Sequence, residues 1–199
     1  MARSLGIDRA QVVAVAADLA DAVGLERLTL AQVAARLGVK LPSLYNHVAG
    51  LPGLKRELAL LGARELLERL RCATIGKAGD TAVLALAQAF RAYILAHPGR
   101  YAATLRAPTA ADPDLQQLSQ AIVEVVLAVL EPYRLDADAA LHAVRGLRSL
   151  VHGFAMLELA GGFGLPLDRD ASFGWLLHVY TAGLRAGAPA DSSRSEQAD

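Results

Sequence analysis

Apolar residues recur at three- and four-residue intervals along most of the chain, and no segment alternates apolar and polar residues as a strand would. This spacing is typical of amphipathic helices. Glycines, prolines and capping residues interrupt it repeatedly, and helices are expected to begin and end at these points. The pattern therefore predicts an all-α protein without internal repeats.

The first predicted helix has signals at both of its ends. Asp8 and Gln11 form a capping-box pattern, and Gly24 follows the last residue of the apolar stripe. Two short helices alone bury too little apolar surface to be stable. We therefore expect this first helix to brace the segment that follows it.

The segment from Thr29 to His47 predicts two short helices joined by a tight turn. Thr29 and Gln32 form a second capping box, and Gly38 suits a left-handed residue at the helix end. Pro42 suits the first turn of the next helix, which is expected to continue to Val48. That helix carries more hydrogen-bonding groups than a core helix needs, from Ser43, Tyr45, Asn46 and His47. The segment predicts a helix-turn-helix whose second helix enters the major groove of DNA.

The remaining sequence predicts a long helix and five others. Asp80, Asp112 and Asp136 are read as N-caps, and the expected spans are 52–75, 80–97, 100–106, 113–132, 136–159 and 171–186. The first of these would be roughly 35 Å long and could link a DNA-facing domain to a second domain. The polar tail over 188–199 is expected to be disordered.

Basic charge is concentrated in the helix-turn-helix segment, although the whole chain is neutral with 20 basic and 20 acidic residues. From Arg27 to Arg56 there are five basic residues and no acidic residue. A local basic patch of this kind is typical of contact with DNA phosphates. The alternative is a capped helix pair that does not touch DNA, which occurs in many all-α proteins.

The same residues resemble a known family. The runs LTLAQVAARLGV and KLPSLYNHV, after an apolar helix, are similar to the DNA-binding domain of TetR-family transcriptional regulators over roughly Asp8 to Leu58. The resemblance implies a dimeric, all-helical protein from a group that consists mostly of repressors. It also implies a helix-turn-helix DNA-binding domain over 1–55 and a helical effector-binding and dimerisation domain over 56–187.

Residue roles follow from the match to the family motif. The resemblance implies that the groove contacts come from Lys40, Leu41, Ser43, Asn46 and His47. It implies that the contacts with the DNA backbone come from Thr29, Tyr45 and Lys55. Leu51 stands where such regulators often carry a basic residue, so one phosphate contact is expected to be missing.

The C-terminal half carries a second, partial resemblance. His152 and Gly153 are similar to the His-Gly pair of WHG-type TetR regulators, but Arg148 stands where the tryptophan is expected. His152 is read either as a ligand contact or as a hydrogen-bonded structural residue. Gly146 and Gly153, seven residues apart, would let a partner helix approach closely. The family resemblance implies dimerisation through residues 136–160 and 170–186.

An apolar effector pocket is expected in the C-terminal domain, mainly because the family resemblance implies one. Its candidate lining comes from several helical segments and consists of Phe90, Tyr93, Tyr101, Leu105, Val126 and Met156. Arg106 and His152 are the polar groups best suited to orient a small hydrophobic ligand. The alternative is that these residues simply fill the core.

Other chemistry has no signature in the sequence. There is no metal-binding spacing, no nucleotide loop and no nucleophile motif, so neither a metal, a cofactor nor catalysis is expected. Cys72 is the one cysteine and is read as a core residue of a protein from a reducing compartment. With no signal peptide and no membrane span, the cytoplasm is the expected location.

These observations together predict a ligand-responsive transcriptional repressor that binds a palindromic double-stranded DNA operator as a homodimer. A small, largely hydrophobic effector would release it from DNA. The alternative is an all-α small-molecule-binding protein, or an enzyme, whose helix-turn-helix is vestigial.

Overall fold

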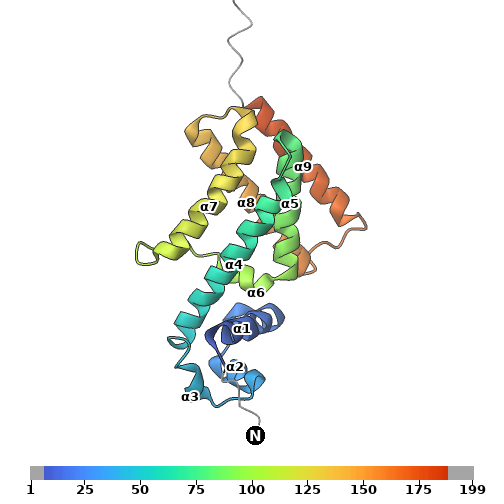
Figure 1. Ribbon diagram of the computed structural model, residues 1–199. Helices are drawn as coiled ribbons and strands as arrows, with labels where there is room; N and C mark the ends of the chain where they lie inside the picture. The colour runs from blue at the N-terminus through green and yellow to red at the C-terminus, as the bar shows by residue number, and fades with distance from the viewer. Residues whose placement is uncertain (1–6, 188–199) are drawn as a thin grey trace, which may run out of the picture. The chain divides into compact units, whose positions relative to one another are not determined.

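The computed structural model describes residues 7–187, and this part of the chain is helical with no strand (Figure 1). The predicted disordered tail over 188–199 lies outside the described residues. The helices are α1 (Arg9–Val23), α2 (Leu30–Leu37), α3 (Leu41–Leu44), α4 (Gly50–Thr74), α5 (Gly79–Ala96), α6 (Pro98–Ala103), α7 (Pro113–Leu130), α8 (Ala137–Leu159) and α9 (Arg169–Ala186). Two 3₁₀ turns, η1 (Leu25–Arg27) and η2 (Glu131–Tyr133), complete the described elements.

Most helix ends lie within two residues of their predicted positions; the exceptions are the C-terminal ends of α3 and α6, which come four and three residues early. Smaller shifts have local causes: helix α6 begins at Pro98, two residues earlier than predicted, because proline suits the first helical turn. Helix α9 begins at Arg169 because the carboxylate of Asp168 accepts a hydrogen bond from the N–H of Ala171 at 2.7 Å. Asp80 was predicted as an N-cap, but it lies inside the first turn of α5 and binds other side chains.

The described chain divides into two compact units. The first contains residues up to 69 together with 92–122, and the second contains 70–91 together with the residues from 123 onward. The expected functional boundary at residue 55 lies inside α4, within the first unit. That boundary concerns function, and it stays a prediction.

The first unit has a hydrophobic core shared by α1, α2, α3 and the first half of α4. Its buried residues are Val12, Ala16, Ala17, Ala20, Leu25, Leu28, Leu30, Val33, Ala34, Leu44, Val48, Leu54 and Leu58. Both helices of the predicted helix-turn-helix contribute to this one core. The core therefore fixes α2 and α3 against the two longer helices.

Helix α6 packs tightly on α1 in the same unit. A Cβ built at Gly99 would lie 2.1 Å from the backbone carbon of Ala20, so only glycine permits this approach. The backbone N–H of Arg100 donates to Asp21 at 2.9 Å, and its guanidinium donates to Asp18 at 2.6 Å and to Glu65 of α4 at 3.2 Å. Burial opposes the charge of Arg100, but Glu65, Asp21 and Asp18 outweigh it and raise the pKa of Arg100.

The second unit is held by polar contacts between distant segments as well as by its core. Arg91 pairs with Glu158 of α8 at 2.8 Å and with Asp170 of α9 at 2.7 Å, and it stacks on the rings of Phe154 and Phe173. Stacked guanidinium groups of this kind remain charged while their stems contribute packing. These contacts join α5, α8 and α9.

The prediction that Cys72 is a core residue is wrong, because its side chain is exposed on α4. Leu70, two residues earlier, occupies the buried face of that part of the helix.

None of the helices in the described part of the chain combines the length and the apolar character that crossing a bilayer requires. Within residues 7–187, no cluster of three or more histidine, cysteine, aspartate or glutamate side chains is placed to hold a metal ion.

Candidate nucleic-acid interface

Helix α2 is fixed at both ends by its own residues. The hydroxyl of Thr29 accepts a hydrogen bond from the N–H of Gln32 at 3.2 Å, and the Gln32 side-chain oxygen accepts one from the N–H of Thr29 at 2.8 Å. Gly38 is left-handed with φ of 68°, and the N–H of Val39 donates to the carbonyl of Ala34 at 3.0 Å. The capping box and the glycine turn are both confirmed. The glycine at the C-terminal end sets a sharp, defined turn before α3.

Helix α3 is shorter than predicted, because it ends at Leu44 rather than at Val48. The N–H of Tyr45 donates to the carbonyl of Pro42 at 3.3 Å, which is the tighter 3₁₀ spacing, and a turn follows. So short a helix gains little from its own hydrogen bonds. Leu44 and Val48 are both buried, so packing into the core holds the segment in place.

The side chains around these two buried residues include large groups that face solvent. Tyr45 is 59% exposed and Leu41 is 39% exposed, although both carry large apolar surfaces. The other predicted groove contacts are exposed or half-buried: Lys40, Ser43, Asn46 and His47. Together they offer an ammonium, a hydroxyl, an amide, an imidazole and apolar groups, which is the chemistry that reads base edges in the major groove.

Two of the predicted backbone contacts already have partners within the chain. The hydroxyl of Thr29 takes part in the capping box. The ammonium of Lys55 donates to Glu26 at 3.2 Å, and the Glu26 side chain is highly exposed. An exposed ion pair of this kind is weak, so a DNA phosphate could replace Glu26. Glu26 lies one residue before the basic stretch, and sequence reasoning therefore missed it.

Arg56 does not contribute free charge to the basic stretch. Its guanidinium binds Asp112 through two nitrogens at 2.6 and 2.7 Å and reaches Asp114 at 3.1 Å. Hydrogen bonds to Asp112 and then to Asp114 raise the pKa of Arg56. The hydrogen bond from Arg56 also lowers the pKa of Asp112. Arg56 thus joins α4 to the start of α7, a role that its position in the sequence did not indicate.

The eight residues of the predicted effector pocket are divided between the two units. Tyr93, Tyr101, Leu105 and Arg106 belong to the first unit, and Phe90, Val126, His152 and Met156 belong to the second. Four of them are buried: Phe90, Tyr93, Tyr101 and Val126. Leu105, Arg106 and Met156 are exposed, and His152 is half-buried. Their joint role in a pocket stays a prediction.

Tyr93 has a defined structural role whatever else it contacts. Its hydroxyl donates to the carbonyl of Gly62 at 3.1 Å and lies 3.0 Å from a carboxylate oxygen of Glu65. Burial and the adjacent Glu65 carboxylate raise the pKa of Tyr93. The phenol therefore stays neutral and ties α5 to α4 within the first unit.

Comparison with known proteins gives two relatives that match nearly the whole chain. The HTH-type transcriptional regulator Rv0681 of Mycobacterium tuberculosis (strain ATCC 25618 / H37Rv) is 36% identical over 185 residues, which cover 92% of this chain and 84% of the relative. The HTH-type transcriptional regulator YobS of Bacillus subtilis (strain 168) is 33% identical over 185 residues, covering 92% and 96%. The sequence model of a family described as "Tetracyclin repressor-like, C-terminal domain" matches residues 83–180.

Solved structures share the fold at lower sequence identity. A protein with unknown function from Rhodococcus sp. RHA1 superposes with a TM-score of 0.77 at 22% identity, covering 92% of this chain and 98% of the other. TetR-Q116A from Acinetobacter baumannii AYE, solved in complex with minocycline, superposes with a TM-score of 0.70 at 24% identity, covering 93% and 100%. At these identities the likeness is one of fold.

Proposed function

Because the chain belongs to the TetR family of helix-turn-helix transcriptional regulators, we propose that it is a homodimeric repressor of a palindromic operator, released by a small hydrophobic effector. Membership of this family makes it a regulator rather than an enzyme. The observation that carries the proposal is the exposed polar and aromatic surface of α3 and the turn after it, which is held in place by buried Leu44 and Val48. The protein would act in the cytoplasm, where its operator would lie.

Operator binding is tested with the full chain and duplex DNA from the region upstream of its own gene. Fluorescence anisotropy should give a higher affinity for this duplex than for a scrambled duplex of the same length. The affinity should also fall steeply with salt, because lysine and arginine contacts release counterions from the phosphates. Equal affinity for both duplexes at every salt concentration would contradict the proposal.

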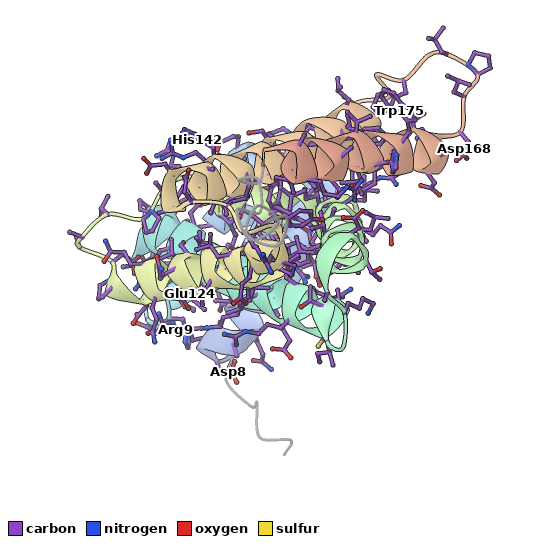
Figure 2. The ribbon with its side chains drawn as sticks, turned by 90° about the horizontal axis from the view of Figure 1, so that it is seen from above. Asp8, Arg9, Glu124, His142, Asp168 and Trp175 are labelled. Atoms are coloured by element: carbon purple, nitrogen blue, oxygen red, sulfur yellow. The ribbon has the colours of Figure 1, made fainter. Side chains whose placement is uncertain are left out.

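The homodimer is supported by apolar surface on α8 and α9. These helices pack against each other, and the hydroxyl of Tyr180 donates to the carbonyl of Ala143 at 2.6 Å. They also carry exposed large apolar residues that are not among the predicted pocket residues: Leu141, Leu157, Leu159, Trp175 and Val179. Figure 2 labels His142 on α8 and Trp175 on α9, and Trp175 is 67% exposed. Exposed large apolar side chains on two helices that pack together are compatible with a protein–protein contact.

Of the two glycines of α8, Gly153 fits the same interface and Gly146 packs against its own chain. A Cβ built at Gly146 would make an ordinary contact with Tyr180 at 3.5 Å, and one built at Gly153 would meet nothing within 4 Å. The close approach that we expected at Gly153 is therefore not made within the described residues. A second copy of α8 is the partner we propose for it. A two-fold axis through this interface would give two recognition helices, which require an operator of two half-sites.

The proposed effector is a small, largely hydrophobic molecule, as the family resemblance implies. TetR-Q116A was solved in complex with minocycline, which supports a small-molecule effector for this fold. A ligand can release DNA only if it binds the DNA-incompetent state more tightly. Helix α4 is continuous from Gly50 to Thr74 and has residues in both units, so we propose that it carries the change.

The effector proposal is tested in two steps. Small hydrophobic compounds are screened by thermal shift, and each hit is then added to the protein–operator complex. A compound that raises the melting temperature and also releases the operator supports the proposal. If every stabilising compound leaves operator affinity unchanged, the coupling is contradicted even where a pocket exists.

A further inference from the structure

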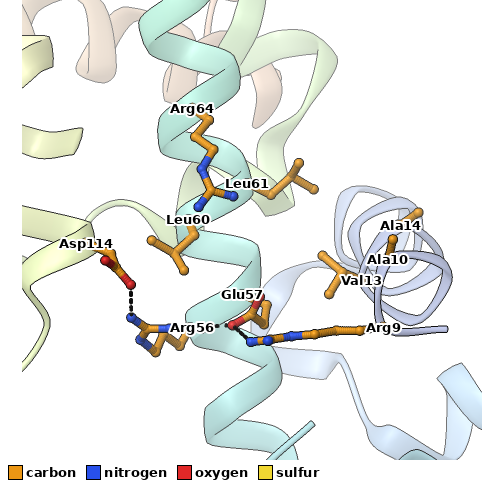
Figure 3. Close-up of a pocket in the computed structure, with 10 residues that line it drawn as sticks. All are labelled: Arg9, Ala10, Val13, Ala14, Arg56, Glu57, Leu60, Leu61, Arg64 and Asp114. Atoms are coloured by element: carbon orange, nitrogen blue, oxygen red, sulfur yellow. Dashed lines mark hydrogen bonds and ion pairs between the residues drawn. The ribbon is translucent and has the colours of Figure 1, made fainter. Parts of the chain in front are cut away.

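A cleft of about 660 Å³ opens between α1 and α4 inside the first unit (Figure 3). Its apolar lining comes from three α1 residues spaced three and four positions apart, which share one face, and from two adjacent leucines of α4. These residues are Ala10, Val13, Ala14, Leu60 and Leu61. Because α1 presents mostly small side chains here, space remains between the helices. The volume lies within the range of small-molecule sites.

The rim of the cleft near the start of α1 carries a continuous row of ion pairs. Arg9 binds Glu57 at 2.5 Å, Arg56 lies 3.5 Å from Glu57, and Arg56 reaches Asp114 at 3.1 Å. Figure 3 shows this row extending from α1 across α4 to Asp114. Arg9 and Arg56 are thus already neutralised by carboxylates of the same protein. They close one end of the cleft.

Arg64 differs from Arg9 and Arg56 because it does not take part in this row of ion pairs. It lies seven residues after Glu57, which places both on the same face of α4 on either side of Leu60 and Leu61. The Arg64 side chain is exposed and has no ion-pair partner within residues 7–187. The cleft lining therefore holds one arginine in excess of its carboxylates, beside an apolar floor. Figure 3 shows Arg64 extending toward the level of Leu61.

We propose that this cleft is a second small-molecule site, which binds an amphipathic monocarboxylate. The apolar part would cover Val13 and Leu60, and the carboxylate would accept two hydrogen bonds from the guanidinium of Arg64. A multiply charged anion fits less well, because Glu57 and Asp114 would repel the charge that Arg64 does not neutralise. The ligand class follows from this pairing of one available cation with an apolar floor.

This site is separate from the proposed effector pocket, since none of the eight predicted pocket residues lines it. The inference therefore goes beyond the proposed function and does not depend on it. The cleft is formed by α1 and α4, the helices that share a core with α2 and α3. A ligand bound here would contact two helices that share a core with the predicted helix-turn-helix.

The test uses octanoate as the probe and the full chain as the protein. Isothermal titration calorimetry should detect binding of octanoate, and 1-octanol, which has no charge, should bind more weakly. Arg64→Gln should weaken octanoate binding by about tenfold, the loss expected for hydrogen bonds to a charged group. The matched control is Arg69→Gln, an exposed arginine on the same helix that does not line the cleft, and its affinity should equal that of the parent.

A second variant tests the apolar part of the site. Ala14→Leu adds a side chain that fills the cleft at an exposed helical position, where leucine is a good helix former. It should abolish octanoate binding while circular dichroism stays unchanged. The proposal is overturned if the parent protein does not bind octanoate, if Arg69→Gln weakens binding as much as Arg64→Gln, or if Arg64→Gln and Ala14→Leu both bind like the parent.

Discussion

At the scale of the residue, the exposed side chains in the turn after α3 lead to different expectations for the DNA backbone and for the bases. Tyr45→Phe removes one hydroxyl from a proposed phosphate contact, so it should weaken binding by about 1 kcal/mol on every duplex. Asn46→Ala removes a proposed base contact, and it should cost about 1–3 kcal/mol on the operator and relax the preference at particular base pairs. Anisotropy titrations on the operator and on single-base variants of it measure both effects.

Gln117→Ala is the control for these two variants, because Gln117 is exposed on α7 and outside the helix-turn-helix. Its operator affinity should match that of the parent. Unchanged operator affinity in both Tyr45→Phe and Asn46→Ala would show that α3 and the turn after it are not the recognition segment.

A second residue-scale expectation concerns Asp80, which accepts a hydrogen bond from the Tyr133 hydroxyl at 2.6 Å and pairs with Arg185. The Tyr133 hydrogen bond, and then the Arg185 contacts, hold the pKa of Asp80 below its ordinary value. Because the folded pKa is the lower one, this stabilisation is present above about pH 4 and is lost as the pH falls through the folded pKa. Tyr133→Phe should therefore destabilise the protein at neutral pH by about 1 kcal/mol.

Urea denaturation at several pH values checks this dependence. The difference between the parent and Tyr133→Phe should shrink as Asp80 becomes protonated. The Tyr133 side chain is buried and keeps its ring in the variant, so lost packing does not explain such a change. A difference that stays constant from neutral to acidic pH would rule out the Asp80 contact as its source.

Residue roles set by near neighbours could be predicted from the sequence, and those set by distant partners could not. The capping boxes at Asp8 and Thr29 involve residues three positions apart, so their signal is local. Arg56 was read as a DNA-facing cation, but its partner Asp112 lies 56 residues away. Which carboxylates an arginine pairs with depends on how the helices pack, and a single sequence does not specify that packing.

At the scale of the element, α6 depends on its close approach to α1. Gly99→Ala would place a Cβ 2.1 Å from the Ala20 backbone carbon, and backbone atoms cannot move aside as a flexible side chain can. We expect a loss of roughly 3 kcal/mol in the free energy of unfolding. Urea denaturation of the full chain measures it.

The control for Gly99→Ala is Gly174→Ala. Gly174 lies inside α9, and a Cβ there would meet no atom within 4 Å. This substitution should be neutral or stabilise the protein by up to about 1 kcal/mol, because alanine is the better helix former. Equal stabilities of the two variants would contradict the close packing of α6 on α1.

Elements with strong caps and a long apolar period were predicted well, whereas short elements were not. Helix α8 begins after Asp136, as expected, and continues to Leu159. Helix α3 was expected to reach Val48, but it ends at Leu44 because a few residues cannot sustain their own hydrogen bonds. Helix α6 begins at Pro98 rather than at Arg100, since tertiary contacts with α1 and the proline fix its position.

At the scale of the whole molecule, the all-α fold and the family followed from periodicity and from one specific motif. The division of the described chain into two units did not, because α4, α5 and α7 each have residues in both. No break in composition marks such a boundary inside a continuous helix. The proposed dimer interface on α8 and α9 likewise did not follow from periodicity, because the pattern does not distinguish a face exposed to solvent from a face buried against a second subunit.

The proposed dimer leads to a prediction that separates folding from assembly. In the single chain, a Cβ built at Gly153 meets no atom within 4 Å. Gly153→Leu should therefore leave the circular dichroism spectrum of the parent unchanged. At an interface between two α8 helices the added side chain costs about 1–3 kcal/mol, enough to weaken dimerisation tenfold or more. Sedimentation should then show more monomer, and operator affinity should fall because a monomer reads one half-site.

Gly153→Ala, a smaller change at the same position, should remain more dimeric than Gly153→Leu. A Gly153→Leu protein with the dimer content and operator affinity of the parent would place the interface elsewhere.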